Sequence, residues 1–331
     1  MPSKPKVFVT RVIPEAGLTL IRNACDAEVW PDPLPPPADV LLAKIADLDG
    51  LVALLTDRLD AAVLDKAARL KVISNFAVGF NNIDIKACTE RGIAVGNTPG
   101  VLTDATADMA FCLLIGAARR LVEGHQYTLA GKWKTWEPLG HLGQDLAGRT
   151  LGIVGMGRIG AALAKRCHGG WDMKILYHDV HKNAGAESQF GARQVDLPTL
   201  LRESDFVSLH TDLNESTRGM IGVTQLQMMK RSAVLINTAR GPLIDAKALA
   251  DALADGVIFA AGLDVTDPEP LPPGDPLLKL PNVIIAPHIA SATVQTRNHM
   301  AEICARNLIA GLTSQTLPAW VNPEVAPKRR V

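Results

Sequence analysis

The sequence has few cysteines, few aromatic residues and no excess of charge of either sign. Its five cysteines form no CxxC pair and none has a histidine nearby at the spacing of metal ligands, so we expect a reducing compartment and no structural metal site. Basic and acidic side chains both number 34, which argues against binding to nucleic acid or to a membrane surface through bulk charge.

No hydrophobic run is long enough to span a bilayer. The longest, MAFCLLIGAA at 109–118, has about half the required length. The first residues contain no apolar segment before a cleavage site, so no signal peptide is apparent. We therefore predict a cytoplasmic protein.

What the sequence does contain is an alternation of short Val- and Ile-rich runs with longer Ala- and Leu-rich segments of helical spacing. This pattern is typical of parallel α/β sheets, and a length of 331 residues predicts about two domains. The strand candidates in the first hundred residues are 7–10, 27–30, 51–56, 71–76 and 93–96. Those from Thr150 onward are TLGIV, KILYH, FVSLH, AVLIN, FAAGLD and VIIAP.

Six strands with intervening helices match a dinucleotide-binding Rossmann sheet. The last helix, about 292–312, is long enough to reach back to the first hundred residues. We therefore expect a Rossmann domain at 99–294 inserted into a smaller flavodoxin-like substrate domain built from 1–98 and 295–331. A nearly all-apolar helix at about 104–121 and an irregular stretch after it predict a dimerisation helix and arm within 104–148.

The segment LGIVGMGRIGAALAKRC places Gly155, Gly157 and Gly160 between an apolar strand and an Ala-rich helix. The first glycine permits a tight turn, the second lets a pyrophosphate approach the backbone, and the third lets helix and strand pack closely. Asp179 ends the next strand, where a carboxylate accepts hydrogen bonds from ribose and repels a 2′-phosphate, so NAD is favoured. His181 and Lys182 follow and could instead bind that phosphate, which leaves NADP open.

Three charged residues lie just beyond later strands: Arg240, Glu269 and His288. Prolines at 268 and 270 flank Glu269 and restrict its backbone. Because ligands bind outside the carboxyl ends of parallel strands, we expect an anion binder, an acid and a base to face one crevice. Taken singly, each residue could be a salt-bridge partner, a solvated acid or a hydrogen-bonded histidine.

The ordered motifs VGMGRIG, NTARG, LDVTDPEP and APHIASAT resemble those of the D-isomer-specific 2-hydroxyacid dehydrogenases, over nearly the whole chain. Within that family the similarity is greatest to glyoxylate/hydroxypyruvate reductases, through KVISNFAVGFNNID and GKWKTWEPLG among other segments. The resemblance implies hydride transfer between a nicotinamide cofactor and a small 2-keto acid.

The resemblance also implies a role for each site residue. His288 would protonate the keto oxygen, and Arg240 would bind the substrate carboxylate. Glu269 would orient the imidazole of His288 and favour its protonated form. Val78 and Gly79 would offer backbone N–H groups to the same carboxylate. Further cofactor contacts are implied for Thr106, Arg158, Ile159, Thr217, Thr238 and Asp264. One departure is Asp212, which stands where the family usually has proline.

These observations predict an NADH-dependent reductase of glyoxylate and hydroxypyruvate that acts as a homodimer, with Trp136 of the arm a candidate to approach the partner's site. Two alternatives stay open. One is another member of the family, acting on phosphoglycerate, D-lactate or 2-ketogluconate. The other is a non-catalytic NAD-sensing protein resembling transcriptional corepressors. The side chains around Leu54, Leu55 and Phe76 would decide the choice of keto acid.

Overall fold

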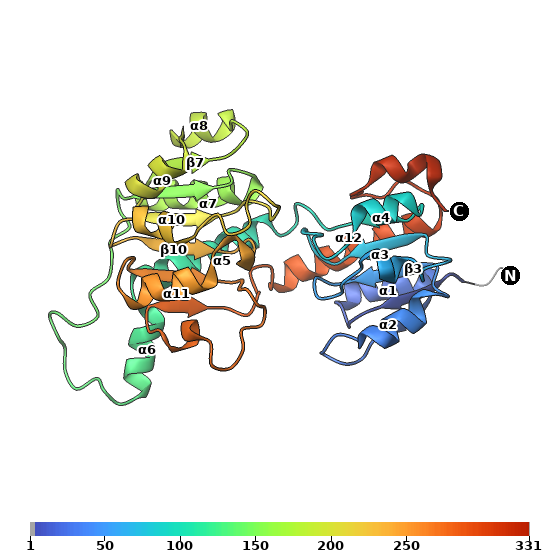
Figure 1. The fold of residues 1–331 in the computed structure, drawn as a ribbon, viewed down its shortest axis with the longest axis horizontal. Helices are drawn as coiled ribbons and strands as arrows, with labels where there is room; N and C mark the ends of the chain where they lie inside the picture. Colours follow the sequence, from blue (N-terminus) through green and yellow to red (C-terminus); the bar gives the residue numbers. More distant parts are fainter. Residues whose placement is uncertain (1–3, 331) are drawn as a thin grey trace. The chain divides into compact units, whose positions relative to one another are not determined.

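The computed structural model describes residues 4–330, and the chain folds into two compact units (Figure 1). The first unit holds the residues up to Leu102 together with those from Ala292 onward, and the second is Thr103–Ser291. Val101 and Leu102 belong to the first unit because they pack against its hydrophobic core.

A five-stranded parallel sheet forms the centre of the first unit. Its strand order, β2-β1-β3-β4-β5, is the flavodoxin-like order. Every residue of β3 and β4 is buried, as expected for a sheet covered on both faces. The strands are β1 (Lys6–Val9), β2 (Asp26–Val29), β3 (Gly50–Ala53), β4 (Val72–Asn75) and β5 (Ala94–Gly96).

The C-terminal segment completes this unit, as its helix packs against α1 and against β3 and β4. The Ser74 hydroxyl donates a hydrogen bond of 2.8 Å to the carbonyl of Cys304, which joins the sheet to that helix. The helices of the unit are α1 (Glu15–Ala24), α2 (Ala38–Ile45), α3 (Ala61–Leu64), α4 (Ile85–Glu90), α12 (Val294–Leu312) and the 3₁₀ segment η3 (Pro323–Lys328).

The second unit contains a seven-stranded parallel sheet in the order β12-β11-β10-β9-β6-β7-β8, the Rossmann order with one strand added. All six predicted strands are present. A seventh, β8, was missed because its two residues are exposed and polar and pair only at the sheet edge. The strands are β6 (Thr150–Val154), β7 (Lys174–His178), β8 (Arg193–Gln194), β9 (Phe206–Leu209), β10 (Val234–Asn237), β11 (Ala260–Leu263) and β12 (Val283–Ile285).

The long apolar helix of this unit is shorter than predicted. It ends at Ala118, because Arg120 takes a φ of +51° and starts a separate helix, α6. Figure 1 shows α6 and the irregular segment after it standing away from the sheet. The helices are α5 (Thr103–Ala118), α6 (Leu121–Leu129), α7 (Arg158–Trp171), α8 (Ala184–Phe190), α9 (Leu197–Glu203), α10 (Val223–Met228) and α11 (Ala246–Ala254), with 3₁₀ segments η1 (Gly241–Leu243) and η2 (Pro276–Lys279). Within residues 4–330, no helix has the length and apolar character needed to cross a membrane.

Candidate active site

The glycine-rich turn joins β6 to α7, and its three glycines have three different surroundings. Gly155 has a φ of +95°, which side chains rarely adopt. A Cβ on Gly160 would lie 2.3 Å from the Gly155 carbonyl oxygen, so only glycine allows the helix this close. Gly157 has open space, which leaves room for a phosphate beside the backbone.

The start of α7 supplies hydrogen-bond donors next to this turn. Arg158 and Ile159 are its first two residues, and the first N–H groups of a helix have no intrahelical acceptor. These groups and the helix dipole favour an anion. The turn and the helix start therefore fit the diphosphate of a dinucleotide.

Asp179 follows β7 directly, and both of its carboxylate oxygens are anchored. Oδ2 accepts from the N–H of Met156 at 2.8 Å and Oδ1 from the N–H of His181 at 2.9 Å. Each oxygen retains a lone pair for a hydroxyl donor. Lys182, which could have bound a 2′-phosphate, pairs with Glu187 at 3.1 Å. The carboxylate is thus fixed against the glycine-rich turn and can accept hydrogen bonds from a ribose.

The three threonines predicted to contact the cofactor use their hydroxyl groups differently. Thr238 follows β10, and its buried hydroxyl has no hydrogen-bond partner among the residues that the structure describes. The Thr217 hydroxyl donates to the carbonyl of Asp212 at 2.7 Å and accepts from the N–H of Asn214 at 2.8 Å. Thr106 is buried in the first turn of α5. Since a buried hydroxyl normally has a partner, Thr238 fits an added polar ligand best.

His288 and Glu269 lie on separate loops, and their side chains meet. Nδ1 of His288 is 2.5 Å from Oε1 of Glu269. Burial acts to raise the pKa of Glu269, but the hydrogen bond with His288 and the charge of its imidazole outweigh burial, and the pKa lies below its ordinary value. With Nδ1 held by a carboxylate, the imidazole can donate a proton through Nε2.

Asp264 holds the backbone around His288, which has a φ of +53°, uncommon for a residue other than glycine. The N–H of His288 donates to the Asp264 carbonyl at 2.9 Å. The Asp264 carboxylate accepts from the N–H groups of Ile289 and Ala290 at 2.7 and 2.8 Å. Burial raises the pKa of Asp264, although these two hydrogen bonds act in the opposite direction. Both carboxylate oxygens of this predicted cofactor contact therefore fix the loop that carries the imidazole.

Arg240 follows β10, and its Nη1 donates to the Ala239 carbonyl at 2.7 Å. Burial lowers the pKa of Arg240, while the negative charges of Glu269 and Asp212 act in the opposite direction. Asp212, the departure from the family pattern, thus acts on Arg240 as well as lying in the loop of Thr217. A guanidinium, a carboxylate and an imidazole follow β10, β11 and β12, which are neighbours in the sheet.

In the first unit, Val78 and Gly79 lie in the loop after β4. Neither backbone N–H has a hydrogen-bond acceptor within residues 4–330. Backbone donors without a partner at the carboxyl end of a parallel strand are suited to bind an anion.

His210, at the end of β9, was not singled out from the sequence, since a histidine after a strand carries no distinctive signal. Its Nε2 is 2.8 Å from the Ser208 hydroxyl, and its backbone lies against Gly155. Burial lowers its pKa to about 4, so the ring is neutral at pH 7. Within residues 4–330, no group of three or more His, Cys, Asp or Glu side chains could hold a metal ion.

Comparison with known proteins identifies the family of the chain. Residues 111–290 match the family model of the D-isomer specific 2-hydroxyacid dehydrogenase, NAD binding domain. The chain belongs to this family. The resemblance predicted from the sequence motifs is confirmed, and the protein is an oxidoreductase whose second unit binds a nicotinamide dinucleotide.

Relatives of this 2-hydroxyacid dehydrogenase match it over almost its full length. A glyoxylate reductase of Korarchaeum cryptofilum is 53% identical over 327 residues, 98% of each chain. A solved structure from Thermus thermophilus has a TM-score of 0.89 and 47% identity, covering 96% of this chain and 99% of its own. An NADPH-dependent glyoxylate/hydroxypyruvate reductase of Sinorhizobium meliloti, in complex with NADP and malonate, has a TM-score of 0.84 and 31% identity over 99% of each chain. The two-domain α/β fold is therefore confirmed.

Proposed function

We propose that this 2-hydroxyacid dehydrogenase reduces small 2-keto acids, with glyoxylate and hydroxypyruvate as its first substrates and NADH as reductant. The observation that carries the proposal is the His288–Glu269 pair, 2.5 Å apart, with Arg240 on the neighbouring strand end. Relatives named glyoxylate reductase, 53% and 51% identical, support the choice of substrate.

In the proposed reaction the cofactor supplies the hydride, and the protein supplies the proton and binds the substrate. The nicotinamide supplies a hydride to the keto carbon. His288 donates its Nε2 proton to the keto oxygen, and Glu269 keeps the imidazole oriented and favours its protonated form. Arg240 binds the substrate carboxylate through its planar, permanently charged fork. The N–H groups of Val78 and Gly79 bind the same carboxylate.

The proposed preference for NADH rests on Asp179. Its carboxylate lies at the glycine-rich turn, where a 2′-phosphate would bring a second negative charge close to it. The neighbouring ammonium of Lys182 is paired with Glu187, which weakens its attraction for that phosphate. The Sinorhizobium meliloti relative uses NADPH, so the preference has to be measured for this chain.

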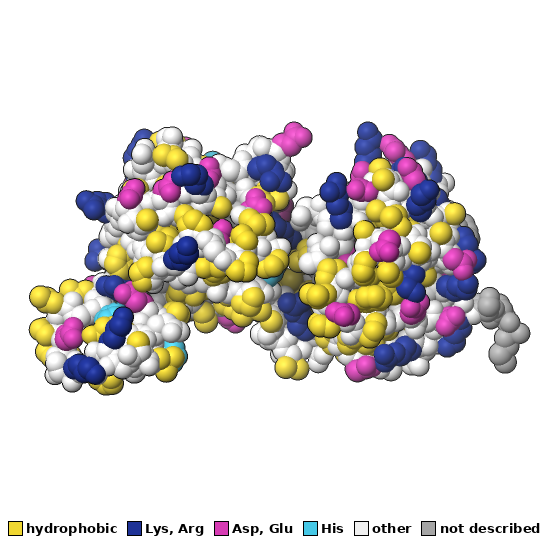
Figure 2. All heavy atoms as spheres, turned by 60° about the horizontal axis from the view of Figure 1, so that its bottom comes forward, with side chains coloured by type: hydrophobic (Ala, Val, Ile, Leu, Met, Phe, Trp, Pro, Cys, Tyr) yellow, Lys and Arg dark blue, Asp and Glu magenta, His cyan; other side chains and the backbone are white. Residues whose placement is uncertain are grey.

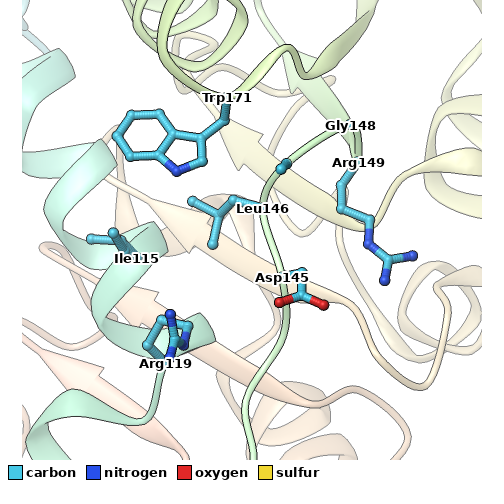
Figure 3. A pocket seen from close by; sticks show the side chains of 8 residues that line it. Ile115, Arg119, Asp145, Leu146, Gly148, Arg149 and Trp171 are labelled. Carbon is cyan, nitrogen blue, oxygen red and sulfur yellow. The ribbon is translucent and has the colours of Figure 1, made fainter.

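We also propose that two copies associate through the arm, while a cytoplasmic location stays a prediction. Trp136 is 79% exposed, and other large apolar side chains of α6 and the arm are exposed too, as Figure 2 shows for this projecting segment. A hollow of about 490 Å³ where the arm returns to the sheet is lined by Ile115, Leu146 and Trp171 together with Arg119, Asp145 and Arg149 (Figure 3). A second copy would cover the exposed apolar side chains of α6 and the arm. Light scattering that gave the mass of a single chain would contradict the association.

The proposed function is tested by oxidation of NADH, followed by absorbance, with glyoxylate, hydroxypyruvate, pyruvate and phosphohydroxypyruvate. NADPH is run in parallel. We expect the first two substrates to be reduced fastest and with NADH. Tight NADH binding without turnover of any substrate would contradict the proposal and favour an NAD-sensing protein.

A further inference from the structure

Three consecutive carbonyl groups in the loop after β4 accept hydrogen bonds from other residues of the first unit, and each of these hydrogen bonds is called a tie below. The carbonyl of Ala77 accepts from the N–H of Thr98, that of Val78 from Nδ2 of Asn97, and that of Gly79 from Nδ2 of Asn75, each at 2.8 Å. Two of the three donors are asparagine side chains. The two asparagines lie 22 positions apart in the sequence, one at the end of β4 and one just after β5.

Because the peptide bond is planar, a hydrogen bond that fixes a carbonyl group also fixes the direction of the N–H group that follows it. In a trans peptide the C=O and the following N–H point in opposite directions. The hydrogen bond from Thr98 to the carbonyl of Ala77 therefore turns the N–H of Val78 away from Thr98, and the hydrogen bond from Asn97 to the carbonyl of Val78 turns the N–H of Gly79 away from Asn97. The third tie does the same for the N–H of Phe80, which also has no hydrogen-bond partner within residues 4–330.

Both asparagines are themselves held in place. Asn75 is fully buried, and its Oδ1 accepts from Nδ2 of Asn82 at 3.3 Å. Asn82 also donates to the carbonyl of Leu54 at 3.0 Å. The backbone carbonyl of Asn97 accepts from Nδ2 of Asn307, in α12, at 2.8 Å. The donors that set the peptide planes are thus neutral amides fixed by the core of the unit.

We propose that Asn75 and Asn97 are positioning residues for the substrate carboxylate, and that Phe80 adds a third backbone donor beside Val78 and Gly79. This inference rests on the proposed function, because it takes the loop as part of the carboxylate site. Without either tie, a peptide of the loop can rotate and present its carbonyl oxygen to the anion. The carboxylate then loses a hydrogen bond and meets a negative partial charge.

The test compares Asn97→Ala and Asn75→Ala with the wild-type enzyme in steady-state reduction of glyoxylate. Each variant should raise the KM for glyoxylate by about tenfold or more, the loss expected for hydrogen bonds to a charged group, while the KM for NADH changes less than about twofold. Calorimetric binding of oxalate, with NADH present, should weaken by a similar factor. Asn322→Ala is the control, since Asn322 is as fully buried as Asn75 in the same unit but bonds to Ile93 and Val95 instead of the loop.

The outcomes separate the inference from the proposed function. If the wild-type enzyme does not reduce glyoxylate, the proposed function is wrong, and oxalate binding still tests the loop. If Asn97→Ala and Asn75→Ala behave like Asn322→Ala, with a lower melting temperature and unchanged KM for glyoxylate and affinity for oxalate, the positioning role is wrong. A parallel rise in the KM values for glyoxylate and NADH would also overturn it.

Discussion

The two units share one architecture but present different chemistry at the carboxyl ends of their strands. The second unit presents charged side chains, Arg240, Glu269 and His288, after three neighbouring strands. The first presents uncharged backbone N–H groups, and the direction of two of them, those of Gly79 and Phe80, depends on Asn97 and Asn75. The type of a charged residue decides what its side chain can bind. Every residue except proline has a backbone N–H, so what a backbone N–H can bind depends on the hydrogen bonds that orient its peptide.

The largest expected effect comes from replacing His288, the proposed proton donor in the second unit. His288→Asn should lower kcat for glyoxylate about 10²- to 10⁴-fold, the range expected for losing a general acid, because asparagine cannot supply the proton. The affinity for NADH, measured by fluorescence titration, should stay the same. A loss of kcat below about tenfold would show that another group donates the proton.

A smaller effect is expected from Arg240→Lys, which keeps the charge and removes the planar fork. The KM for glyoxylate should rise roughly 10- to 100-fold, as one or more charge-assisted hydrogen bonds are lost. Comparison with Asn97→Ala sharpens the contrast between the units, since both changes should act on the same carboxylate. An unchanged KM in the lysine variant would mean that charge alone suffices at this position.

Glu269→Gln should change the pH dependence more than the maximal rate. The hydrogen bond with His288 holds the pKa of Glu269 below its ordinary value, so the wild-type carboxylate is ionised at neutral pH and is protonated only as the pH falls through that lowered value. The wild-type kcat/KM should therefore fall at the acid end as Glu269 is protonated, and the glutamine variant, which has no group to protonate there, should lack this step. The profile is measured from about pH 3 to 9, and an identical acid limb in both proteins would contradict the role of Glu269.

The smallest expected effect concerns stability. The pKa of His210 is about 4 in the folded protein against an ordinary 6.5, so between these values the unfolded chain binds a proton that the folded chain does not. Its contribution to stability is therefore complete above pH 6.5 and is lost as the pH falls toward 4. His210→Asn should reduce the loss of unfolding free energy between pH 7 and pH 5, measured by urea denaturation. An equal loss in both proteins would show that His210 does not titrate in this range.

The sequence by itself determined the two parallel sheets, the glycine-rich turn and the identity of the charged residues. These features depend on local patterns: alternating strand and helix segments, glycines at fixed spacing, and charged side chains just after apolar strands. It did not reveal β8, because that edge strand has no apolar residue, nor the end of α5 at Ala118, because Arg120 adopts its positive φ without a glycine signal.

Only the tertiary structure decided how the loops are held. The carboxylate of Asp264 binds the backbone of residues 289 and 290, and the side-chain amide of Asn97 sets the plane of the peptide that joins residues 78 and 79. Asp264 and the residues it holds are 25 and 26 positions apart in the sequence, and Asn97 is 19 positions from the carbonyl it holds. Such pairings form when strands and helices pack, so no local pattern of residues encodes them.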